Sequence, residues 1–137
     1  MDGNKETITK QLEARGIYPT PQRMKIAQVM LMKKQHLSAD NVLQAVNMTE
    51  SAVSKATVYN TLGLFARKGL VREVIVDPSK VFYDSNTGMH HHFYNIDTGE
   101  LSDIGSDDLS IDRLPEMPET TELDGVDVIV RVRQASS

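Results

Sequence analysis

Start and stop signals for helices recur at short intervals through the first 80 residues and end in a two-stranded hairpin. Thr20-Pro21 reads as a helix cap followed by proline at the first helical position, where the missing N–H costs nothing. Gly16 and Gly69 read as helix ends, because glycine accepts the left-handed conformation that follows a last turn. Four helices are predicted: one around Ile8 and Leu12, one from Thr20-Pro21 to Lys34, one after Ser38, and one from Ser54 or Lys55 to Gly69.

Two predicted strands follow, at residues 70–76 and 81–83, joined by a turn at Asp77-Pro78-Ser79-Lys80. Helices followed by a hairpin are the plan of a winged helix-turn-helix, in which the helix before the wing enters the major groove of DNA. The polar face of that helix offers the candidate DNA contacts Ser54, Lys55, Thr57, Tyr59 and Asn60. A helical domain with a solvated charged face is the alternative.

The net charge of residues 1–80 is opposite in sign to that of residues 81–137. The 137 residues carry a formal net charge of −4, which taken whole argues against a nucleic-acid partner. Residues 1–80, however, hold twelve Lys and Arg against seven Asp and Glu, whereas residues 81–137 hold three against twelve. A net +5 beside a net −9 indicates a polyanion-binding region joined to a part with another role.

The acidic part predicts a small domain of its own. Two strands, 93–96 and 100–104, flank the turn Asp97-Thr98-Gly99, a short helix is expected at residues 107–113, and a closing strand at 126–132. About 50 residues are marginal alone, so pairing with a second copy is expected. The predicted fold class is α+β: a winged helix-turn-helix DNA-binding domain (1–84) and a small C-terminal α/β dimerisation domain (85–137).

A histidine pair at the junction predicts a metal site. His90 and His92 emerge on one face of an extended segment, with Asp84 upstream and Asp103 on the expected paired strand. Nitrogen and carboxylate ligands without thiolate suit Fe²⁺ or Mn²⁺, with Zn²⁺ possible in vitro. His36, between the second and third helices, offers a third imidazole. A polar surface strand is the alternative interpretation of the histidine triplet.

The motifs in their order resemble the ferric uptake regulator family, from about residue 5 to 133. The resemblance rests on Gly16-Ile17-Tyr18-Pro19-Thr20-Pro21-Gln22-Arg23, His36-Leu37-Ser38-Ala39-Asp40, Ala56-Thr57-Val58-Tyr59-Asn60-Thr61-Leu62 and His90-His91-His92-Phe93-Tyr94. Asp97-Thr98-Gly99-Glu100-Leu101 continues it. Tyr59-Asn60 and the C-terminal segment point to the peroxide-sensing (PerR-like) and iron-response (Irr-like) branches.

The resemblance implies a homodimeric regulator, a repressor of iron or peroxide-stress genes, that binds an A·T-rich palindromic operator in double-stranded DNA. A cytoplasmic location is expected because the sequence predicts no membrane span or signal peptide. It adds Arg23 to the DNA-binding candidates. It also implies one regulatory metal site, whose ligands fall on His36, Asp84, His90, His92 and Asp103. In the peroxide-sensing branch, oxidation of a ligand imidazole, here His36 or His90, would release metal and then DNA.

Some family features are not expected here. The sequence contains no cysteine, so the structural zinc that many relatives hold with two Cys-x-x-Cys pairs is excluded, as is a cysteine-proline haem motif. Haem binding through the histidine triplet stays open, and a haem-responsive Irr-like regulator is an alternative function. A non-haem iron enzyme is a further alternative, although the acidic part is small for a substrate pocket. No membrane span or signal peptide is predicted.

Overall fold

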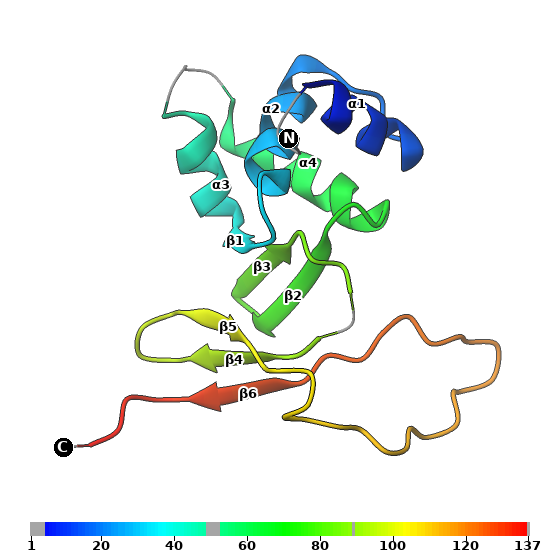
Figure 1. Cartoon of the computed structure of the whole chain (residues 1–137), viewed down its shortest axis with the longest axis vertical. Coiled ribbons are helices and arrows are strands. Elements are labelled where there is room, and N and C mark those ends of the chain that lie inside the picture. Colours follow the sequence, from blue (N-terminus) through cyan, green and yellow to red (C-terminus); the bar gives the residue numbers. More distant parts are fainter. Residues whose placement is uncertain (1–4, 49–52, 89, 137) are drawn as a thin grey trace. The chain divides into compact units, whose positions relative to one another are not determined.

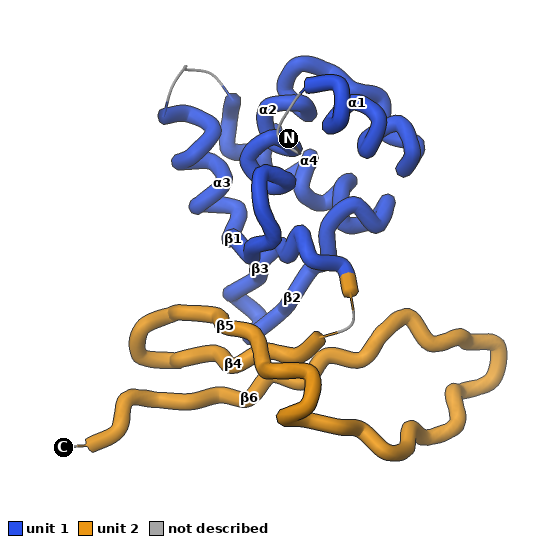
Figure 2. The backbone as a smooth tube through the Cα atoms, viewed as in Figure 1, with its two compact units in different colours: residues 1–87 blue, residues 88–137 orange. Residues whose placement is uncertain are grey.

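The structure is a computed structural model that describes residues 5–48, 53–88 and 90–136. The chain divides into two compact units, residues 1–87 and 88–137 (Figure 2). The division falls three residues after the domain boundary expected at residue 84. Within the described residues, no helix combines the length and the apolar character needed to cross a membrane.

The described residues of the first unit form four helices and three short strands (Figure 1). In chain order these are α1 (Lys5–Ala14), α2 (Pro21–Leu31), β1 (His36–Ser38), α3 (Ala39–Val46), α4 (Lys55–Arg67), β2 (Arg72–Asp77) and β3 (Lys80–Asp84). The helices begin where their caps predict. The hydroxyls of Thr20, Ser38 and Ser54 each accept a hydrogen bond from the backbone N–H three residues later. The winged helix-turn-helix plan is confirmed.

One apolar core holds the four helices together. Its fully buried members include Leu12 of α1, Ile26 of α2, Val42 of α3 and Phe65 of α4. Because α4 contributes Val58, Leu62 and Phe65 to this core, its opposite side is free to face solvent.

The segment after α4 differs from the predicted strand. Gly69 adopts a positive φ of 77°, and the Leu70 N–H donates back to the Phe65 carbonyl, so the chain closes the end of the helix there. Leu70 and Val71 are buried in the core, and β2 starts only at Arg72. The expected strand therefore began too early, because these two apolar residues serve the helix end.

The sheet of the first unit has the order β1-β3-β2, with antiparallel neighbours. Sequence patterns predicted β2 and β3 but not β1, which has only three residues. Its position beside β3 sets His36 opposite Asp84.

The described part of the second unit contains a three-stranded sheet of order β5-β4-β6, made from β4 (His92–Asn95), β5 (Leu101–Asp103) and β6 (Ile129–Val132). β4 pairs antiparallel with β5 and parallel with β6. The helix expected at residues 107–113 is absent, and these residues form turns and irregular backbone that is mostly exposed. The prediction was wrong because a short helix without a packed apolar face is unstable in water.

Candidate metal centre and nucleic-acid interface

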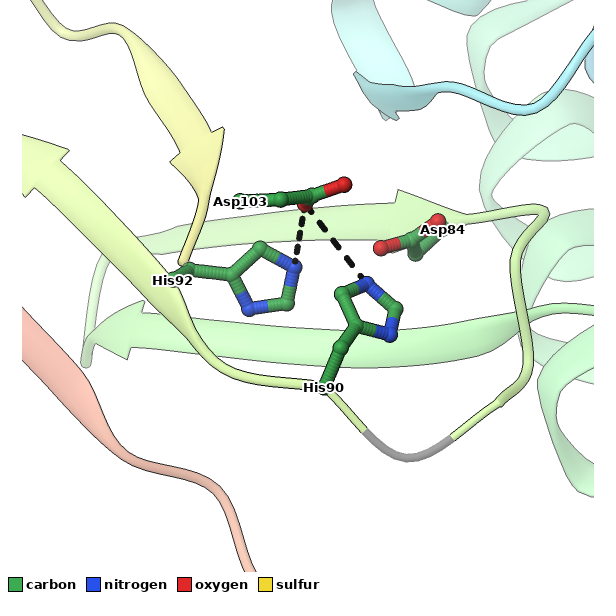
Figure 3. Close-up of side chains that lie close together, drawn as sticks. All are labelled: Asp84, His90, His92 and Asp103. Atoms are coloured by element: carbon green, nitrogen blue, oxygen red, sulfur yellow. Dashed lines mark ion pairs between the residues drawn. The ribbon is translucent and has the colours of Figure 1, made fainter. Parts of the chain in front are cut away.

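Three predicted ligands meet in the second unit. The Nε2 atoms of His90 and His92 lie 3.6 Å and 3.4 Å from the same oxygen, Oδ1 of Asp103 (Figure 3). The ligand atoms of the three residues all lie within 4.8 Å of one another. Two imidazole nitrogens and a carboxylate oxygen converging on one point make a donor set that suits a divalent cation of the Fe²⁺, Mn²⁺ or Zn²⁺ type.

The orientation of the His90 ring favours metal binding. Its Nδ1 lies 2.6 Å from the carbonyl oxygen of Gly88, so Nδ1 carries the proton and donates it to that carbonyl. In the neutral form of the ring, Nε2, which faces Asp103, carries the lone pair that a metal would bind. Histidines that bind metals commonly hold their other ring nitrogen in this way, which fixes both the tautomer and the ring plane.

The middle histidine of the triplet has a different role. His91 Nδ1 accepts a hydrogen bond of 3.1 Å from the N–H of Val128, the residue before β6, and the His91 carbonyl accepts one from the Ile104 N–H. Successive side chains of an extended segment alternate in direction, so His91 departs from the direction of His90 and His92. His91 therefore ties strands together and stands outside the ligand set.

The hairpin that places Asp103 depends on Asn95. The Asn95 side-chain oxygen accepts hydrogen bonds from the Asp97 and Thr98 N–H groups, at 2.9 Å and 3.1 Å. Gly99 completes the turn with a φ of 76°, which glycine adopts without strain. The resulting register pairs His92 of β4 with Asp103 of β5.

The other two predicted ligands are paired in the first unit. His36 of β1 and Asp84 of β3 are directly opposite residues of an antiparallel ladder, so their side chains share one face of the sheet. One oxygen of the Asp84 carboxylate accepts a 2.8 Å hydrogen bond from the Asn86 N–H.

Ser85 fastens the segment that carries His36. Its hydroxyl lies 2.9 Å from the Gln35 N–H and within 3.1 Å of the carbonyls of Lys33 and Gln35, and its own N–H donates to the Gln35 carbonyl. Gln35 in turn donates through its side chain to the Val29 carbonyl at 2.8 Å, near the end of α2. These bonds hold the approach to β1 against the end of β3.

Ser85→Ala is expected to destabilise the first unit by about 1–2 kcal/mol, because it leaves the Gln35 N–H without its side-chain acceptor. Urea unfolding monitored by helical circular dichroism measures the change. Ser110→Ala, at an exposed position in irregular backbone, is the matched control. An equal stability of the two variants would contradict the assigned role of Ser85.

The first turns of α4 present the predicted nucleic-acid interface. Lys55, Tyr59 and Asn60 are exposed on the side of α4 that faces away from the core. Ser54 and Thr57 also serve the helix cap, since the Ser54 hydroxyl accepts from the Thr57 N–H and donates to the Thr57 hydroxyl at 2.9 Å. The remaining candidate, Arg23, lies on α2, where its guanidinium donates to the Tyr18 carbonyl at 3.0 Å.

Sequence reasoning missed one residue beside this interface. Asp40, in the first turn of α3, accepts a 3.1 Å hydrogen bond from the Tyr59 hydroxyl. This bond raises the pKa of the Tyr59 hydroxyl, since it stabilises the protonated phenol next to a carboxylate. Nineteen residues separate the two positions, and no pattern in the sequence connects them.

Comparison with known proteins assigns the chain to a family. Residues 14–130 match the model of the ferric uptake regulator family. The peroxide-responsive repressor PerR of Staphylococcus aureus (strain Mu50) is 33% identical over 112 residues, which cover 81% of this chain and 76% of the relative. The corresponding protein of Staphylococcus epidermidis is 31% identical over 104 residues, covering 76% and 69%.

Solved structures agree with this assignment. The ferric uptake regulator of Pseudomonas aeruginosa with manganese has a TM-score of 0.68 and 25% identity, covering 93% of this chain and 98% of that protein. The Vibrio cholerae ferric uptake regulator has the same fold, with a TM-score of 0.70 at 20% identity, covering 92% and 98%. The order of elements, the histidine and aspartate cluster and these similarities lead to one conclusion: the chain belongs to the ferric uptake regulator family.

Proposed function

We propose that this protein is a metal-dependent, DNA-binding transcriptional regulator, acting as a repressor of iron or peroxide-stress genes. The observation that carries the proposal is the convergence of two histidine Nε2 atoms on one carboxylate oxygen, 3.4 Å and 3.6 Å away, with the His90 ring held in the tautomer that binds metal. The chemistry of these donors fits Fe²⁺ or Mn²⁺.

The proposed site has five ligands, drawn from both units. His90, His92 and Asp103 come from the second unit, and the ladder pair His36 and Asp84 comes from the first. A cation bound by both groups would limit the angle between the units. Metal could then favour the DNA-binding form to the extent that it binds that form more tightly than the other.

The proposed partner is double-stranded DNA, bound by a homodimer at an A·T-rich palindrome. The basic first unit supplies attraction to phosphate, and the exposed start of α4 supplies groups that reach base edges. Two recognition helices related by a twofold axis match two half-sites of a palindrome.

The test is a gel-shift selection from duplexes with a randomised centre, with and without Mn²⁺. Retarded, palindromic sequences are expected only with Mn²⁺, and Asp103→Asn should abolish the retardation, because its amide is a much poorer ligand than a carboxylate. Asp107→Asn, an exposed acidic residue of the same unit, is the control for the lost charge. If the selected duplexes were retarded equally with and without Mn²⁺, the proposed metal dependence would be contradicted.

Peroxide is the proposed signal. Fe²⁺, if bound, would activate hydrogen peroxide for cleavage of its O–O bond, and the imidazole itself would be the net two-electron reductant. His90 is the candidate in the second unit because 13% of its side chain is exposed, against 0% for His92, and His36 is the candidate in the first unit. Oxidation would insert one oxygen atom into an imidazole C–H bond while the other oxygen leaves as water, and the modified ring would bind metal poorly.

Intact and peptide mass spectrometry tests this signal. Protein loaded with Fe²⁺ and treated with hydrogen peroxide is expected to gain one oxygen atom on His36 or His90, with parallel loss of DNA binding. Protein loaded with Mn²⁺ should stay unmodified at both positions. The proposal fails if oxygen is incorporated equally with either metal, or only on methionine side chains.

A further inference from the structure

In the free protein, the Tyr59 hydroxyl already donates its only proton in a hydrogen bond. It donates to Oδ1 of Asp40 across 3.1 Å, from the exposed side of α4 to the first turn of α3. The Lys55 ammonium lies 5.6 Å from the centre of the Tyr59 ring, and this cation–π contact holds the ring from another side. With 41% of its surface exposed, Tyr59 is fixed in direction yet still accessible.

This commitment limits what the hydroxyl can recognise. A phenol has one proton to donate, and a carboxylate can only accept. While the bond to Asp40 persists, the Tyr59 oxygen can act only as an acceptor toward a further partner. Phosphate oxygens, guanine O6 and N7 and thymine O4 are all acceptors, so none of them pairs with it. The donors available in the major groove are the amino groups of adenine N6 and cytosine N4.

We propose that Asp40 is a positioning residue that turns Tyr59 into an acceptor, so that this pair selects adenine or cytosine over guanine or thymine at one position of each half-site. The inference rests on the proposed DNA-binding function. Each base pair carries one amino group in the major groove, on A or on C. The proposed selection therefore distinguishes the two orientations of a base pair, by requiring the amino group on the strand that Tyr59 contacts. The Asp40 carboxylate also keeps Tyr59 from contacting the phosphate backbone, because it repels phosphate and occupies the only proton of the phenol.

The test begins with the Mn²⁺-loaded protein and a library of duplexes with a randomised centre. Each base pair of the selected duplex is then inverted in turn, so that A·T becomes T·A and G·C becomes C·G. The Kd of the protein for each inverted duplex is measured by fluorescence anisotropy. At one position per half-site, wild-type protein should prefer the amino base by about 3- to 10-fold, the value of one hydrogen bond. Tyr59→Phe and Asp40→Ala should each lose that preference, and the double variant should lose no more than either alone.

Controls separate recognition from folding and charge. Glu13→Ala removes an exposed carboxylate from another helix of the same unit and should keep the preference. An alkaline NMR titration of the Tyr59 ring should show its pKa lowered in Asp40→Ala, since the hydrogen bond that raises it is gone. Retention of the base preference in Asp40→Ala, or a preference for keto bases in the wild type, overturns the inference alone. Failure to select any sequence with Mn²⁺ overturns the proposed function and the inference with it.

Discussion

His92→Ala is expected to lower the affinity for Mn²⁺ by on the order of 100-fold or more, since even loss of an outer partner of a metal ligand costs about 10- to 100-fold. His92 is fully buried, lies at the start of the central strand of its sheet, and directs Nε2 toward the Asp103 carboxylate. Alanine there removes one of the two imidazoles that face the Asp103 carboxylate. Equilibrium dialysis against Mn²⁺ measures the loss, and Mn²⁺-dependent gel retardation should disappear in parallel.

A matched histidine in the same triplet serves as the control. His91→Asn keeps an acceptor for the Val128 N–H and removes an imidazole that faces elsewhere, so Mn²⁺ affinity should stay near the wild-type value. His90→Ala repeats the ligand loss at a half-buried position, in case His92→Ala fails to fold. At a Mn²⁺ concentration 100 times its Kd, wild-type protein should gain about 2.7 kcal/mol of stability, and His92→Ala should gain almost none. A similar loss of affinity in His91→Asn would refute the division of roles within the triplet.

Phe65→Ala is expected to destabilise the first unit by about 3–5 kcal/mol, the usual cost of deleting a buried phenyl ring. The ring is fully buried and anchors the last turn of α4 in the core that α1, α2, α3 and α4 share. A loss of this size is a large part of the roughly 5–15 kcal/mol that stabilises a typical domain. Urea unfolding, monitored by helical circular dichroism, measures it, and DNA binding should weaken because α4 loses its fixed orientation.

Phe93→Ala is the corresponding control. Phe93 is 38% exposed on β4, in a unit whose described residues contain no helix. The helical unfolding transition should shift by no more than about 1 kcal/mol in this variant. If Phe65→Ala produced an equally small shift, the core assigned to the first unit would be wrong.

Local chemistry explains why the helices could be predicted from sequence. Each cap needs only a hydroxyl and an N–H three residues later, and Thr20, Ser38 and Ser54 supply both within one turn. β1 lacked such a signal because three residues carry no periodicity, and the strand exists only through pairing with β3. The pairing of His36 with Asp84 was therefore beyond local patterns.

The candidate site likewise combines features that local sequence predicts with features that depend on tertiary contacts. The spacing of His90 and His92 is local, and their shared direction followed from the geometry of extended chain. The His90 tautomer is set by the backbone carbonyl of Gly88. Any residue at position 88 would supply this carbonyl, so the sequence could not predict the contact. Tyr59 was predicted to be an interface residue from its place on the helix before the wing, whereas its bond to Asp40 depends on how α3 packs against α4.

The parallel pairing of β6 with β4 has a consequence for the order in which the second unit folds. β4 and β5 close over the short turn at residues 96–100, whereas β6 arrives only after residues 104–128. Closing the longer segment costs roughly 1.4 kcal/mol more in chain entropy. The hairpin can therefore form first, and it already holds His92 and Asp103, with His90 two residues away. A metal bound by the proposed ligands would then stabilise an early stage of folding, and docking of β6 is expected to be the slow, last step.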